Sequence, residues 1–67
     1  MYKILVVNAA APHREFGYLT DGSDNDVEFD NIEAAKAFIE KEKEGLSQEE
    51  RLQFAFVVAD KDGNRVK

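Results

Sequence analysis

One segment near the middle of the chain has the spacing of an amphipathic helix. The residues from Asp30 to Glu44 read DNIEAAKAFIEKEKE. Within this segment, Ile32, Ala35 and Ile39 recur at the intervals of three and four residues that line one side of a helix. The charged residues fall mainly on the opposite side. The rest of the chain therefore has to supply a surface against which only one side of this helix packs.

Residues at both ends of the segment have the properties of helix caps. The carboxylate of Asp30 is able to accept a hydrogen bond from the backbone N–H of Glu33, whose side chain can return the bond in a capping box. Gly45 is expected to end the helix in the left-handed conformation, with Leu46 folded back on the last turn. The sequence therefore predicts a helix that begins at Asp30 and ends at Glu44.

Segments on both sides of this helix have the composition of β-strands. Tyr2–Val7 and Gln53–Asp60 are rich in β-branched and aromatic residues. Glu15–Thr20 is a further strand, in which Gly17 is expected to mark either a bulge or a close approach of another backbone segment. Val27–Phe29 and Arg65–Lys67 are short enough to pair only at the margins of a sheet. The element order is strand, strand, helix, strand and a short return strand.

This order predicts an α+β fold in one small domain that spans residues 1–67. The four expected strands form an antiparallel sheet in the spatial order 2-1-3-4, with the one amphipathic helix packed on one face. Alternation along the strands then decides which residues lie beneath the helix. Those expected there are Tyr2, Ile4, Val6, Phe16, Tyr18, Phe54, Phe56 and Val58.

The face of the sheet opposite the helix is expected to be apolar as well. An antiparallel sheet with one solvated face normally alternates apolar and polar residues, and an uncovered apolar patch on a small protein usually marks an interface. We therefore predict a homodimer that packs through this face, or a closure of the face by the loop Ala9–Arg14. The predicted interface residues are Leu5, Val7, Leu19, Ala55, Val57 and Ala59.

Acidic residues are concentrated in the segment Asp21–Asp30, which contains five carboxylates and no basic residue. Such a loop has the charge to occupy the basic groove of a nucleic-acid-binding protein as a mimic of phosphate groups. Whether it binds a divalent ion stays open, because its spacing does not match a calcium-binding loop, and we predict no metal site. The acidic-loop residues are Asp21, Asp24, Asp26 and Glu28.

Composition excludes several classes of protein. The chain has no cysteine, which excludes a disulfide framework, a thiolate zinc site and a cysteine nucleophile, and which fits a cytoplasmic location. Its formal net charge of −5 argues against direct contact with nucleic acid or anionic membranes. No apolar run approaches the roughly 20 residues that span a bilayer.

Residue types used in catalysis are present without a catalytic arrangement. The single histidine, His13, falls in a predicted loop, and Ser23 and Ser47 are expected in a turn and at a helix start. There is no glycine-rich phosphate loop and no metal-ligand spacing. We therefore expect no enzyme and no cofactor. The first hypothesis is a non-catalytic module for protein–protein interaction, the second an acidic mimic or inhibitor, and the third a small-ligand protein or enzyme with a site between subunits.

Overall fold

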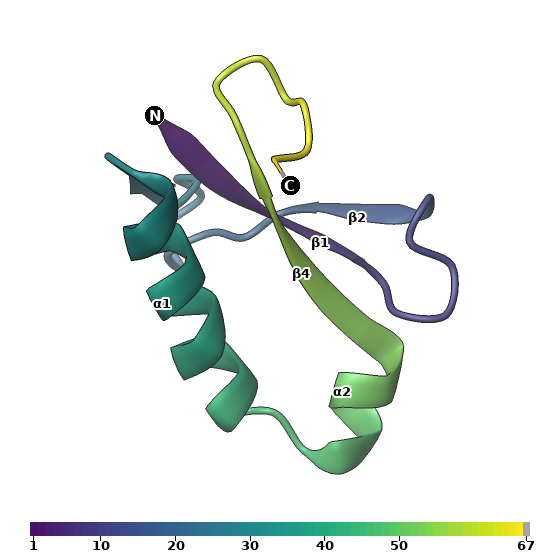
Figure 1. Cartoon of the computed structure of the whole chain (residues 1–67). Helices are drawn as coiled ribbons and strands as arrows, with labels where there is room; N and C mark the ends of the chain where they lie inside the picture. The colour runs from purple at the N-terminus through teal and green to yellow at the C-terminus, as the bar shows by residue number, and fades with distance from the viewer. Residues whose placement is uncertain (67) are drawn as a thin grey trace.

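The computed structural model describes residues 1–66 and has an α+β fold (Figure 1). Helix α1 packs on one face of a small antiparallel sheet, and the shorter α2 leads directly into the last strand. The predicted fold class and the strand–strand–helix–strand order are therefore confirmed. In chain order the elements are β1 (Tyr2–Asn8), β2 (Glu15–Tyr18), β3 (Glu28–Phe29), α1 (Ile32–Glu44), α2 (Gln48–Gln53) and β4 (Phe54–Ala59).

Strand β1 is the centre of the sheet. It pairs with β4 along one edge, from Lys3 to Asn8, and with β2 and β3 along the other edge. Between β2 and β3 the chain leaves the sheet after Thr20 and rejoins it at Asp26, where these two residues form a bridge. The acidic loop is therefore an excursion from one edge of the sheet.

A return segment pairs with the outer edge of β4, as the sequence predicts. Arg65 lies opposite Ala59, and the N–H of Val66 donates a hydrogen bond of 2.8 Å to the C=O of Val58. The turn before it contains Gly63 at a φ of 85°, a conformation that favours glycine. Lys67, the last residue of the predicted strand, lies outside the described residues.

A bulge in β2 changes which side chains face α1. Val6 lies opposite Gly17, but Val7 lies opposite Glu15, so that Phe16 is an extra residue. Because side chains alternate between the two faces of a sheet, one extra residue in a strand moves the side chains beyond it to the opposite face. Tyr18 therefore lies opposite Leu5 on the face away from the helix.

Leu19 accordingly packs with the helix-side core. The faces predicted for Tyr18 and Leu19 are both wrong, because strict alternation along Glu15–Thr20 takes no account of where the bulge interrupts the pairing. The other five residues predicted opposite the helix form one cluster there, and it comprises Leu5, Val7, Ala55, Val57 and Ala59.

Buried apolar residues lie on both faces of the sheet. On the helix side, Ile4 and Val58 pack with Ala35 and Ile39. Tyr2, Phe29, Phe38, Phe56 and Val66 surround this cluster. On the other face Val7 and Ala59 have no exposed surface. A single sheet therefore has two small cores, one of which lies beneath the helix.

The N-cap of α1 lies one residue later than predicted, and the helix ends at Glu44 with a different cap conformation. Asn31, not Asp30, is the N-cap, and its side-chain oxygen accepts a 2.7 Å hydrogen bond from the N–H of Ala34. Gly45 has a φ of −83°, which is right-handed, so that the predicted left-handed cap is wrong. The helix start expected at Ser47 is present, and Ser47 forms a capping box with Glu50 at the beginning of α2.

Candidate functional site

The residues predicted to form a homodimer interface are largely buried within the single chain. Leu5 is 4% exposed, and Val7 and Ala59 are fully buried. Leu19 lies on the other side of the sheet. A partner would contact none of the three buried residues without first displacing the segments that cover them.

Two segments from opposite ends of the chain come together over this face. The guanidinium of Arg65 donates hydrogen bonds to the C=O of Pro12, at 2.5 Å, and to the carboxylate of Glu15, at 3.2 Å. Gly63 approaches Tyr18 so closely that a Cβ added to it would lie 3.1 Å from the tyrosine hydroxyl oxygen. The contacts therefore favour closure of this face by the loop Ala9–Arg14, together with the turn before Arg65.

The surface that remains open lies along the outer edge of β4, where Ala55 and Val57 are half-buried. Two adjoining hollows of about 320 Å³ each lie between this edge, α1 and α2, and Lys43 and Phe56 line both of them. We call them together the β4-edge groove. Its other large apolar lining residues are Ile39, Leu46, Phe54, Val58 and Val66.

The backbone of Phe56 points into the open edge beside this groove. In an antiparallel pair, alternate residues direct both N–H and C=O toward the partner strand. Gln53 directs its C=O to Ala9 on the β1 side, whereas Val58 directs its C=O outward to Val66. Phe56 is an even number of residues from Val58, so its N–H and C=O also point outward.

Both neighbours of Phe56 along this edge have partners. The N–H of Phe54 donates to the C=O of Glu50, and the C=O of Val58 accepts from Val66. Within residues 1–66, no hydrogen bond is found for either backbone group of Phe56. Among the described residues, the edge of the sheet therefore has an unpaired position at Phe56, between α2 and the return segment.

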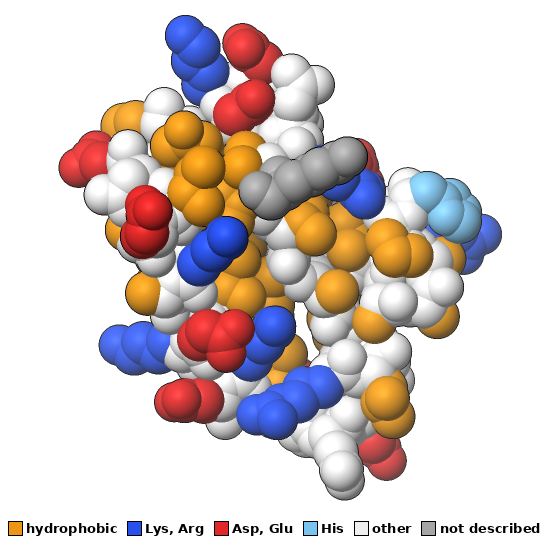
Figure 2. Space-filling model, viewed as in Figure 1, with side chains coloured by type: hydrophobic (Ala, Val, Ile, Leu, Met, Phe, Trp, Pro, Cys, Tyr) orange, Lys and Arg blue, Asp and Glu red, His pale blue; other side chains and the backbone are white. Residues whose placement is uncertain are grey.

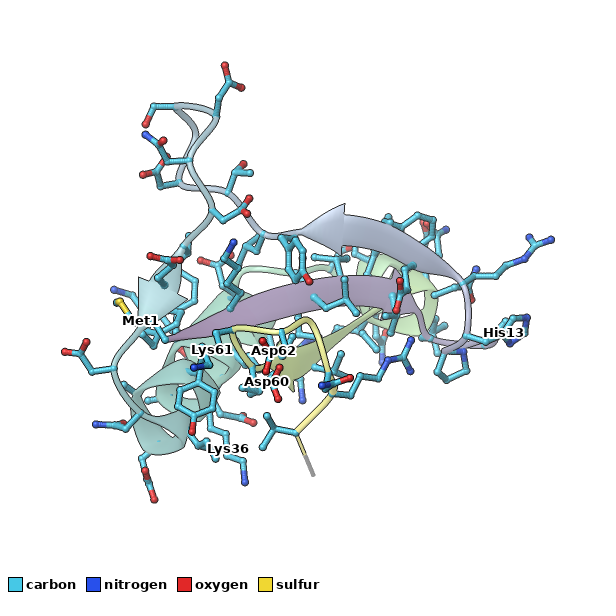
Figure 3. The ribbon with its side chains drawn as sticks, turned by 90° about the horizontal axis from the view of Figure 1, so that it is seen from above. Met1, His13, Lys36, Asp60, Lys61 and Asp62 are labelled. Carbon is cyan, nitrogen blue, oxygen red and sulfur yellow. The ribbon has the colours of Figure 1, made fainter. Side chains whose placement is uncertain are left out.

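Basic side chains surround the groove. Lys36, Lys43 and Arg51 line it, against a single acidic residue, Glu40, whose carboxylate lies 3.8 Å from the Lys43 ammonium. Figure 2 shows hydrophobic side chains along the middle of this side of the molecule, Lys and Arg around its lower part, and a hollow between α1 and α2. Figure 3 shows Lys36 extending from α1 on the side where the chain ends. This is a cationic site on a protein of net charge −5.

Arg51 fixes the lower end of the groove. Its guanidinium donates two hydrogen bonds, of 3.0 Å and 2.7 Å, to the C=O of Lys43 in the last turn of α1. A cation at this position also interacts favourably with the negative end of the helix dipole. Arg51 thereby joins α2 to α1 and holds a positive charge beside Phe54.

The acidic-loop residues are partly engaged within the protein. The ammonium of Lys3 lies 3.0 Å from the Asp26 carboxylate and 3.9 Å from that of Glu28, and the hydrogen bond that Lys3 donates to Asp26 is the main cause of its raised pKa. Hydrogen bonds from the hydroxyl and N–H of Ser23 lower the pKa of Asp21. Asp24 is exposed, and the loop that contains it projects from the sheet in Figure 3.

The residues considered for catalysis are not brought together. His13 is exposed at the outer end of its loop and points away from the sheet (Figure 3). The carboxylate of Asp60 accepts hydrogen bonds of 2.9 Å from the N–H groups of Asp62 and Asn64, as expected for a hairpin turn. Over the described part of the chain, no three potential metal ligands lie close enough to hold an ion.

Sequence reasoning identified Ala55 and Val57 but missed the groove that they border. The missing information was how α1, α2 and the return segment are arranged around β4, which depends on tertiary structure. In the described chain, neither helix has the length and apolar character needed to cross a membrane. Comparison with protein-family models, with curated proteins and with solved structures finds no match.

Proposed function

We propose that this protein is a non-catalytic module that binds another protein through the β4-edge groove. The observation that carries the proposal is the apolar groove beside β4, where no hydrogen bond is found for the backbone of Phe56 within residues 1–66. Proteins usually cover or interrupt exposed sheet edges, because such an edge is a template for pairing with another chain.

The groove also has the composition of a binding surface. It combines apolar residues such as Phe56 and Val66 with charged residues at its margin. Interfaces typically have an apolar centre and a polar rim. This location replaces the opposite face of the sheet as the proposed interface, because Leu5 and Val7 are already buried there.

Site-specific photo-crosslinking in the source cells tests the proposal. A photoreactive amino acid in place of Lys43 lies in the groove, and the same substitution of Lys41 lies on the exposed helix surface outside it. We expect a discrete protein adduct from position 43 and none from position 41. Equal adducts from both positions, or none from either, would refute the proposed binding surface.

A second candidate function is the acidic mimic, which is supported by the projection of the Asp21–Asp26 loop from the sheet (Figure 3). The negative charge that this loop can offer to a partner is smaller than the sequence indicates, because the Lys3 ammonium already pairs with the carboxylates of Asp26 and Glu28. The mimic predicts salt-sensitive capture of a basic host protein. Asp21→Asn combined with Asp24→Asn should abolish that capture, and unchanged capture would exclude this function.

A further inference from the structure

We infer that the partner inserts its C-terminal residue, an apolar residue with a free carboxylate, into the hollow at the α2 end of the β4-edge groove. This α2-side hollow is lined by Lys43, Leu46, Arg51, Phe54, Ala55 and Phe56. The inference rests on the proposed function and specifies the partner's chemistry. Three features of the hollow carry it: its two cations, its apolar walls and its closed lower end.

The α2-side hollow is cationic on a protein that is acidic overall. Lys43 and Arg51 line it, and within residues 1–66 no acidic residue does. The whole chain, by contrast, has 14 acidic and 9 basic residues. The carboxylate nearest to Lys43, that of Glu40, belongs to the adjoining hollow and forms an exposed ion pair of 3.8 Å, which is a weak contact. The α2-side hollow is therefore complementary to an anion.

Arg51 retains the capacity to bind that anion. Its Nε and one terminal nitrogen donate hydrogen bonds to the C=O of Lys43. A guanidinium has further N–H groups beyond the two used there, in a planar arrangement that suits a carboxylate. Arg51 can therefore hold α2 against α1 and donate to a carboxylate at the same time.

The C-terminus of α1 opposes an anion only weakly. The end of a helix carries a partial negative charge of about half an elementary charge. The C=O of Lys43 already accepts a hydrogen bond of 3.1 Å from the N–H of Leu46, in addition to the two from Arg51. The full positive charges of Lys43 and Arg51 therefore outweigh the helix dipole at this position.

The walls of the α2-side hollow select an apolar side chain. Leu46, Phe54 and Phe56 line it and are half-buried. A phosphate or another wholly polar anion would gain nothing from these walls, whereas an aliphatic side chain would bury apolar surface against them. The hollow measures about 320 Å³, which is at the lower end of the range for ligand sites. It therefore suits one apolar residue that carries its own negative charge.

The closed lower end favours a chain terminus over a segment that passes through. The Arg51 side chain joins α2 to the last turn of α1 there, and Figure 2 shows Lys and Arg around this part of the molecule. A chain that enters from the open side meets the guanidinium where the hollow ends. In a C-terminal residue, the carboxylate and the apolar side chain are attached to the same carbon atom. An internal acidic residue supplies the charge without the apolar group, and capture of terminal carboxylates is a known mode of recognition.

Two peptides that differ only in their C-terminal group test the role of the carboxylate. Acetyl-Gly-Gly-Leu with a free carboxylate, titrated into isotope-labelled protein, should shift the NMR signals of the Phe54 and Phe56 amides and of the Arg51 Nε–H. The same peptide with a C-terminal amide should bind at least about tenfold more weakly, because it lacks the charge-assisted hydrogen bonds. No shift at millimolar free acid, or equal binding of the two peptides, would overturn the inference.

Two further ligands test the apolar side chain and the chain end. Acetyl-Gly-Gly-Gly with a free carboxylate should bind about fivefold more weakly than the leucine peptide, or weaker still, because it buries no side chain. Equal binding would show that the hollow recognises charge alone and would overturn the inference. Hexanoate is a free aliphatic carboxylate without a peptide chain. Tighter binding of hexanoate than of the leucine peptide would overturn a chain end as the occupant.

Charge variants locate the bound carboxylate. Lys43→Gln should weaken binding of the free-acid leucine peptide about fivefold or more, because it removes one of the two cations of the hollow. Lys41→Gln makes the same change of charge at an exposed position of the same helix that does not line the hollow. It should leave the affinity within about twofold. Equal weakening by the two variants would mean that only net charge matters, and would overturn the assigned site.

Shortening of one wall tests the apolar contact separately. Leu46→Ala should reduce the preference for the leucine peptide over the glycine peptide, because Leu46 lines the hollow. The preference for free acid over amide should persist, since both cations remain. An unchanged preference for leucine would place the bound side chain elsewhere and overturn the inference.

These experiments separate the inference from the proposed function. An adduct from position 43 that maps to an internal segment of the partner would retain the binding surface and overturn the terminal carboxylate. Absence of the position 43 adduct would overturn both.

Discussion

The guanidinium of Arg65 donates a hydrogen bond to the carboxylate of Glu15, at 3.2 Å, although the two residues are 50 positions apart in the sequence. Arg65, in the return segment, lies opposite Ala59 of β4, and Glu15 of β2 lies opposite Val7 of β1. This contact therefore joins the two outer margins of the sheet on the face that α1 leaves open. A second bond from the same group to Pro12 anchors the loop that lies there.

Arg65→Ala should lower the free energy of unfolding by about 1 kcal/mol. It removes one hydrogen bond to a backbone carbonyl and one exposed ion pair, which are worth about 1 kcal/mol and at most about 1 kcal/mol respectively. Urea denaturation measures the change. Arg14→Ala is the matched control, because its exposed side chain makes no ion pair within residues 1–66. A similar effect of the two variants would contradict the role assigned to Arg65.

Two leucines provide a direct comparison of the buried and exposed surfaces. Leu5→Ala should cost about 2–4 kcal/mol, because the side chain is only 4% exposed and its loss leaves a cavity in the second core. Leu52→Ala removes the same atoms from a residue that is 74% exposed, and should cost less than about 0.5 kcal/mol. Chemical denaturation of both variants checks the difference. A small cost at Leu5 would mean that this face is open.

The local elements could be predicted from the sequence, because they depend on near neighbours. The strand at Tyr2–Asn8, the capping box at Ser47 and the turn at Gly63 all follow from patterns a few residues long. The faces of Tyr18 and Leu19 do not, because the bulge is defined by pairing with β1. A single extra residue there was enough to exchange the faces on which these two side chains lie.

The candidate site was less accessible to sequence reasoning for the same reason. Alternation along β4 correctly placed Val57 and Val58 on opposite faces. It does not reveal that Arg65 reaches Pro12, which closes one face. Nor does it reveal that α1, α2 and the return segment leave a groove beside Phe56. Both features arise from contacts between segments that are distant in the chain.

The N-cap of α1 can be identified by paired substitutions. Asn31→Ala should destabilise the protein by about 1 kcal/mol, because it removes the side-chain oxygen that accepts from the N–H of Ala34. Asp30→Ala should have a smaller effect, since Asp30 does not cap the helix. Thermal unfolding of both variants measures the order. A larger loss of stability in Asp30→Ala would instead identify Asp30 as the N-cap, as predicted from the sequence.

The right-handed conformation of Gly45 predicts that an alanine there stabilises the protein, whereas a left-handed cap would predict the opposite. At a φ of −83°, an alanine fits without strain, and a Cβ there would make ordinary contact with the Glu42 carbonyl at 3.5 Å. Gly45→Ala should therefore stabilise the protein by about 0.4–1 kcal/mol, because alanine loses less backbone entropy on folding. A left-handed glycine would instead give destabilisation. Urea denaturation distinguishes the two signs.

The contact between Lys3 and Asp26 should appear as a pH dependence on the alkaline side. The Asp26 hydrogen bond, followed by the charges of Asp26 and Glu28, raises the pKa of Lys3 above its usual value of 10.5. A raised pKa in the folded state contributes stability below pH 10.5, and this contribution is lost as the pH rises through the folded value.

Asp26→Asn should therefore move the pKa of Lys3 back toward 10.5 and flatten the decline in stability above that pH. Asp24→Asn is the matched control, because Asp24 is an exposed carboxylate of the same loop without an ion pair in the described chain. NMR titration of the Lys3 side chain measures the pKa in each variant. Equal shifts in both variants would show that the loop acts through its total charge, whereas a shift confined to Asp26→Asn would show that the 3.0 Å contact is responsible.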